Sequence, residues 1–60
     1  MEQQIIAQAK WLYAFNGGVI PKEQCILQAI QQYGMAKLVK EIQVFDITLN
    51  DYVKYLEKYI

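Results

Sequence analysis

The chain has 60 residues with six lysines, six acidic residues, no arginine and no histidine, so its formal net charge is zero. A chain of this length forms one small domain at most, because it buries only about 60% of the surface that its unfolded form exposes. The neutral charge and the lack of arginine argue against nucleic-acid binding, which relies on a basic surface.

Composition also bears on where the protein acts. No segment approaches the ~18 consecutive apolar residues of a membrane span. Met1 to Gln4 lack the positive charge that begins a secretory signal peptide. We therefore expect a cytoplasmic protein without membrane association. Abundant Ile, Lys, Gln and Tyr beside absent Arg, Ser and His is typical of AT-rich coding sequences, which suggests a bacterial or phage origin.

The first predicted helix covers residues 2–15. Ile5, Ala9 and Leu12 recur at i, i+4 and i+7 and form one apolar stripe. Trp11 and Phe15 lie about a right angle or more from this stripe and give the helix a second apolar flank. Two interpretations are open: either the helix is central and other helices cover it on several sides, or Trp11 and Phe15 are an exposed anchor for a partner.

Glycine and proline separate the first helix from the second. Asn16-Gly17-Gly18 favours a helix stop, since Asn and Gly tolerate the left-handed backbone that closes a helix. Pro21 suits the first turn of a helix predicted over residues 21–33. Ile20 then takes the position from which it can pack on Cys25 as a hydrophobic staple.

Gly34 is predicted to break the chain before a third helix over residues 35–45. The apolar stripe that begins at Met35 and runs to Phe45 lies on the opposite side from Ile26 and Ile30, so a straight helix cannot bury both stripes against one neighbour. A capping box then marks the next start, because Asp51 follows Thr48 at the third position.

The last predicted helix covers residues 49–59. Leu49, Val53 and Leu56 form its apolar edge, and Ile47 before the cap is placed to pack on Tyr52. A ridge of three tyrosines runs beside this edge, formed by Tyr52, Tyr55 and Tyr59. Together the patterns predict an all-α fold, a compact bundle of three to four short helices in a single domain over residues 1–60.

The residues that carry enzyme chemistry are scarce. Cys25 has no histidine to activate it and lies on an apolar helix face, which favours a buried structural cysteine. Asp46 to Asp51 resemble a calcium loop, but Asp51 stands where that loop needs glycine, and the capping box explains the same residues. We expect no catalytic residue, no metal site and no cofactor.

Two alternatives to a protein-binding role stay open. The helices on either side of Gly34 are compatible with a small DNA-binding helix-turn-helix, although this segment lacks the arginines that contact phosphates. Gly17-Gly18 also fits the double-glycine processing site of a secreted peptide precursor, whose mature product would begin at Val19.

We expect a non-enzymatic protein–protein interaction module, such as a small inhibitor, adaptor or regulatory subunit. Tryptophan and tyrosine are favoured anchors at interfaces, because they bury a large area at low rotamer cost. The partner is another protein, a second copy of the chain in a homodimer, or both. The predicted contact residues are Trp11, Phe15, Tyr52, Tyr55 and Tyr59.

Overall fold

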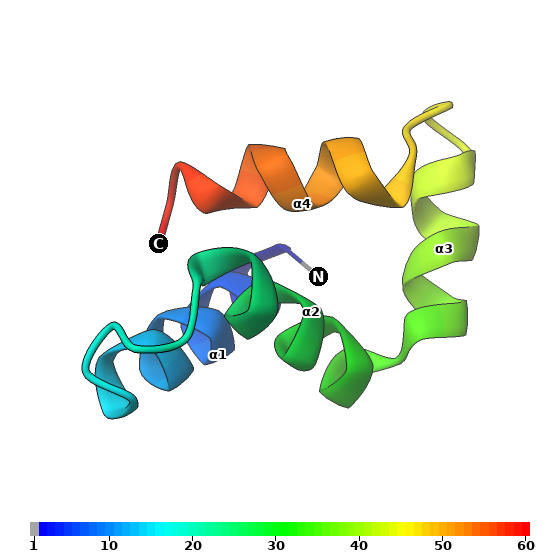
Figure 1. Ribbon diagram of the computed structural model, residues 1–60. Helices are drawn as coiled ribbons and strands as arrows, with labels where there is room; N and C mark the ends of the chain where they lie inside the picture. Colours follow the sequence, from blue (N-terminus) through cyan, green and yellow to red (C-terminus); the bar gives the residue numbers. More distant parts are fainter. Residues whose placement is uncertain (1) are drawn as a thin grey trace.

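Four α-helices joined by short turns make up the computed structural model, which describes residues 2–60. The helices are α1 (Glu2–Phe15), α2 (Lys22–Tyr33), α3 (Met35–Gln43) and α4 (Leu49–Glu57). No strand occurs within the described range, which confirms the predicted all-α bundle. Figure 1 shows α1 and α2 packed together, with α3 leading away to α4, which returns over α2.

The glycine pair after α1 acts as the predicted helix stop. The Gly18 N–H donates to the Tyr13 carbonyl at 3.1 Å, and the Gly17 N–H donates to the Ala14 carbonyl at 3.0 Å. These two bonds form a Schellman motif, in which the residue after the helix takes a left-handed backbone. Gly17 meets this need with φ 64°, a conformation that costs glycine little.

The start of α2 agrees with the predicted cap, although the helix begins one residue later, at Lys22. Pro21 is the N-cap residue with φ −58° and ψ 149°, and its carbonyl accepts the Cys25 N–H at 3.2 Å. The Cys25 thiol lies 3.9 Å from the Ile20 carbonyl, and the half-buried Ile20 side chain packs against the core. Ile20 thus packs against the core cluster to which Cys25 belongs, as the predicted staple requires.

Gly34 alone joins α2 to α3, so the predicted break is confirmed. Its N–H donates to the Ile30 carbonyl at 2.8 Å and its carbonyl accepts the Leu38 N–H at 3.0 Å. One residue thus ends one helix and begins the next. Its backbone angles, φ 125° and ψ 100°, are strained for any residue with a Cβ. Figure 1 shows the sharp change of direction that results.

Polar and aromatic contacts brace this corner from outside. The Tyr33 hydroxyl at the end of α2 donates to the Glu41 carboxylate of α3, at 3.3 and 3.4 Å from its two oxygens. The Lys37 ammonium lies 4.7 Å from the centroid of the Tyr33 ring, within the range of a cation–π contact. These contacts connect the two helices that Gly34 separates.

The third helix ends at Gln43, two residues before the predicted end at residue 45. A second Schellman motif stops it: the Ile47 N–H donates to the Ile42 carbonyl at 3.2 Å and the Asp46 N–H donates to the Gln43 carbonyl at 3.0 Å. The left-handed position is here occupied by Asp46, with φ 58°. Helical periodicity therefore no longer applies to Phe45, which was predicted as part of the apolar stripe.

The last helix starts as the capping box predicts and ends early. The Thr48 Oγ1 accepts the Asp51 N–H at 3.2 Å, which satisfies one of the free donors of the first turn. At its end, the Tyr59 N–H donates to the Leu56 carbonyl at 2.9 Å, three residues back. This tighter final turn closes α4 at Glu57 rather than at residue 59.

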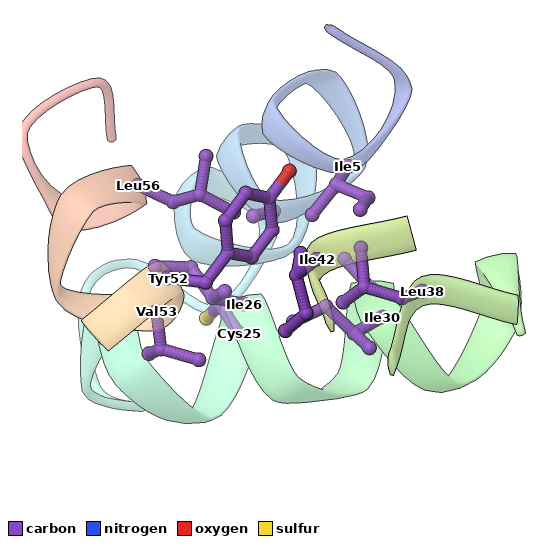
Figure 2. Packing of buried hydrophobic residues seen from close by; sticks show 11 residues of the cluster. Ile5, Cys25, Ile26, Ile30, Leu38, Ile42, Tyr52, Val53 and Leu56 are labelled. Carbon is purple, nitrogen blue, oxygen red and sulfur yellow. The ribbon is translucent and has the colours of Figure 1, made fainter. Parts of the chain in front are cut away.

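The core forms around α2, which packs against each of the other three helices. Figure 2 shows Ile26 and Ile30 of α2 among side chains from all of them. The buried residues are Ile5, Ala9, Cys25, Ile26, Ala29, Ile30, Leu38, Ile42, Tyr52, Val53 and Leu56. The interpretation that α1 is central is therefore wrong: α1 packs on α2 with one side, and its second apolar flank faces solvent.

Asp46 provides a test of the second helix stop. We expect Asp46→Gly to stabilise the fold by about 0.5–1 kcal/mol, because glycine adopts the left-handed backbone without the Cβ clash. For a domain of this size, that corresponds to a melting temperature about 2–8 °C higher. Thermal unfolding monitored by circular dichroism measures this change in melting temperature. Asp46→Ala is the matched control, since it removes the same charge but keeps a Cβ, and it should give no increase.

Candidate partner-binding surface

The most exposed aromatic group lies on the outer side of α1. The Trp11 and Phe15 rings stack with centroids 5.0 Å apart and an interplanar angle of 17°. Trp11 is 57% exposed and Phe15 is 73% exposed. Ile5 and Ala9 occupy the side of α1 that meets α2, so these two rings are left outside. We call this pair the aromatic stack.

The surface around the aromatic stack carries little charge. Among the described residues of α1, those classed as exposed are Gln3, Gln4, Ala7, Lys10, Trp11, Ala14 and Phe15. Lys10 is the one charged side chain in that set, whereas Lys37 and Lys40 of α3 and Asp51 and Lys54 of α4 are exposed. An amphipathic surface helix normally turns a charged face to water. The outer face of α1 therefore lacks the charged side chains of an ordinary solvent-facing helix surface.

The predicted tyrosine ridge divides between core and surface. Tyr55 and Tyr59 are both partly exposed, with ring centroids 5.4 Å apart in an edge-to-face arrangement and hydroxyl oxygens 3.5 Å apart. The hydrogen bond with Tyr59 and the nearby Glu2 raise the pKa of Tyr55 well above its ordinary value. Tyr52 belongs to the core instead. The structure therefore groups the predicted contact residues as one pair on α1 and a second pair, Tyr55 and Tyr59, at the end of α4 and just beyond it. The buried Tyr52 ring lies next to this second pair, with its centroid 6.3 Å from that of Tyr55.

The buried Tyr52 has an unusual environment. Its side chain is 6% exposed, and its hydroxyl has no hydrogen-bond partner among the residues that the structure describes. Burial raises the pKa of Tyr52 above its ordinary value of 10.0, and the carboxylates of Glu2 and Glu41 act in the same direction. Figure 2 shows the ring lying across the core, between Leu56 and Ile42.

A groove of about 460 Å³ lies between three segments: the start of α1, the helix α4, and the end of α3 with the turn that follows it. Its described lining consists of Glu2, Ile42, Phe45, Ile47, Asp51, Tyr52 and Tyr55. Apolar side chains dominate this lining, and both of its charged residues are acidic. We call it the α3–α4 groove. Its size lies within the range of pockets that bind small molecules or anchoring side chains.

Phe45 is an exposed aromatic residue that was not among the predicted contact residues. It is 70% exposed and lies at the mouth of the α3–α4 groove. A signal was present in the sequence, because the capping box at Thr48 leaves only a few residues in which the chain can turn. A residue three positions before that cap is better assigned to a turn than to the buried stripe of a helix.

The structure also places the thiol and the acidic side chains of the described residues. Residues 2–60 hold no group of three or more Cys, Asp or Glu side chains placed to bind a metal ion. The Cys25 side chain is buried in the core. No described helix is long and apolar enough to cross a membrane.

Comparisons with protein-family models, with curated proteins and with solved structures find no match to this chain. A function for this chain is therefore inferred from its own surface.

Tyr52 gives a test of the buried hydroxyl. Tyr52→Phe removes this hydroxyl. The free energy of unfolding at pH 7 should stay unchanged or rise by about 1 kcal/mol, because an unpaired buried hydroxyl costs about 1–3 kcal/mol. The pKa of Tyr52 is higher in the folded chain than in the unfolded chain. The stability that its neutral form contributes is thus complete below pH about 10 and is lost as pH rises through the folded pKa.

Chemical denaturation from pH 7 to pH 11 measures this difference. We expect the advantage of Tyr52→Phe over the wild type to grow above pH 10. Tyr13→Phe, which removes a hydroxyl from a half-buried ring, is the matched control and should not show this growth. A loss of stability in Tyr52→Phe at pH 7 would mean that the hydroxyl has a partner.

Proposed function

We propose that this chain is a non-enzymatic interaction module that docks on a protein partner through the aromatic stack of Trp11 and Phe15. The single observation that supports this function is the exposure of two stacked aromatic rings on a helix face with one charge. Inhibitors, adaptors and regulatory subunits act in this way. The proposal places the protein in the cytoplasm of a bacterium, or of a bacterium infected by a phage, on grounds of composition.

Loose packing does not explain the exposed rings. The accessible surface is 4113 Å² for a chain of 7.0 kDa. The scaling of surface with mass for compact monomers gives about 4,000 Å² for this mass. The fold is thus as compact as an ordinary monomer, and a complete core forms without Trp11 and Phe15. Their position on the surface needs a reason other than poor packing, and docking supplies one.

The free energy gained by burying the two rings exceeds the lower estimate of the association cost by a small margin. A buried aromatic side chain covers about 150–250 Å², so the exposed parts of Trp11 and Phe15 amount to on the order of 250 Å². At ~25 cal/mol per Å² this gives about 6 kcal/mol, against an association cost of at least ~4 kcal/mol. Stacking holds both rings in one conformation before binding, which lowers the entropy cost. Tyr55 and Tyr59 offer a second, half-exposed contact.

The aromatic stack allows a direct test, since Trp11 is the one tryptophan of the chain. In the free protein we expect the red-shifted fluorescence of a solvated indole. Binding of a partner should shift this fluorescence to the blue. The affinity should depend little on salt concentration, whereas phosphate contacts would make the affinity for DNA fall steeply with salt. Calorimetry with the partner should show at least tenfold weaker binding for Trp11→Ala/Phe15→Ala, and unchanged helix content by circular dichroism.

A matched control is available at the other end of the molecule. Val44→Ala also removes exposed apolar surface, from a side chain 80% exposed at the end of α3. Figure 1 shows the turn after α3 and the end of α1 at opposite ends of the molecule. Val44→Ala should bind as the wild type does. Equal affinity of the wild type and Trp11→Ala/Phe15→Ala would contradict the proposal. Intact mass of the native protein separates it from the secreted-precursor alternative, in which the product begins at Val19.

A further inference from the structure

We infer that the α3–α4 groove of one copy receives the aromatic stack of another copy, so that the chain associates head to tail. This inference rests on the proposed function, because it uses the same two rings, and it names their partner. It joins two features of the described surface: an exposed aromatic projection and an apolar groove. Of the groove lining, only Tyr55 was given a part in the docking proposed above.

The two features lie too far apart to meet within one molecule. The chain measures 35 Å along its longest axis. Figure 1 shows the end of α1 and the turn after α3, which contains Phe45, at opposite ends of the molecule. The aromatic stack therefore reaches a groove only on a second molecule. A projection at one end and a hollow at the other is the arrangement of a heterologous contact.

The chemistry of the two surfaces matches. The groove walls combine aliphatic Ile42 and Ile47 with aromatic Phe45 and Tyr55. Apolar walls lose nothing when aromatic rings replace water, and aromatic pairs gain a further ~0.5–1.5 kcal/mol from edge-to-face or offset contacts. A volume of about 460 Å³ is several times that of a cavity that holds a single benzene ring, so it has room for two rings.

The charges are also complementary. Glu2 and Asp51 are the charged members of the described groove lining, and both are negative at pH 7. Lys10, the residue before Trp11, is the charged member of the exposed α1 face and is positive. Opposite charges around an apolar contact fix its orientation more than its strength. With a net charge of zero, two copies also approach without overall repulsion.

The size of the contact sets the expected affinity. The aromatic stack contributes on the order of 250 Å², and the accessible lining of the groove contributes less. Their sum stays below the ~1,200 Å² of the smallest stable complexes. We therefore expect weak, reversible association in the micromolar to millimolar range. Because the contact is heterologous, each open assembly keeps one free stack and one free groove, at opposite ends, unless a ring closes.

Complementation between two variants tests the contact. Trp11→Ala/Phe15→Ala lacks the stack, and Phe45→Lys places a positive charge at the groove mouth, where it repels Lys10. We expect the sedimentation coefficient of the wild type to rise between micromolar and millimolar concentration. Each variant alone should sediment as a monomer. An equal mixture of the two variants should form a dimer that grows no further, because one intact stack and one intact groove remain.

Val44→Lys is the matched control for the blocked groove. Val44 is the neighbour of Phe45 and more exposed, but it does not line the groove. This variant should associate like the wild type. Lys10→Glu should weaken association about two- to fivefold, the range of an exposed ion pair, and Asp51→Lys in the same chain should restore it. Circular dichroism verifies that each variant is folded.

Several results would overturn the inference. A two-fold contact between α1 faces predicts that Phe45→Lys still dimerises and that the mixture forms no new species. A wild type that stays monomeric up to millimolar concentration also overturns it. If that monomer still binds a different protein through Trp11, the proposed function stands without head-to-tail association. If the Trp11→Ala/Phe15→Ala variant keeps all binding, both proposals fail.

Discussion

Burial of the α2 stripe is the constraint on which the rest of the structure depends. Ile26 and Ile30 are fully buried, and each of the other helices contributes side chains to cover them. A helix of 12 residues is only marginally stable alone, so α2 gains its stability from these contacts. Since α1 uses one side to cover α2, its opposite side is free. The surface that we propose for docking is thus a consequence of which helix takes the centre.

Local chemistry explains why much of the fold could be predicted from the sequence. Gly17, Pro21, Gly34 and Thr48 each have backbone or hydrogen-bonding properties that restrict a helix end, and each acts where the pattern placed it. The ends of α3 and α4 were predicted two residues too long. Asp46 is a rare occupant of a left-handed position, so the stop before it left no glycine to detect.

The surface was harder to predict, because periodicity identifies an apolar face but not its neighbour. Trp11 and Phe15 fit both a covered helix and an exposed anchor, and only the packing of α1 on α2 distinguishes the two. Tyr52 and Tyr55 are three residues apart and adjacent on the helix surface, yet one is buried and the other is not. Such a difference depends on how α4 is rotated against α2, which no local signal in its sequence defines.

The single-residue link at Gly34 has a consequence for how the molecule opens. α3 and α4 have nine residues each and are too short to persist as isolated helices, whereas α1 and α2 share the most extensive helix pairing. The C-terminal half therefore forms the less protected cooperative unit, with amide hydrogens that exchange at lower free energy than those of α1 and α2. All of the described groove lining except Glu2 belongs to this unit, so local unfolding of the unit disassembles the groove.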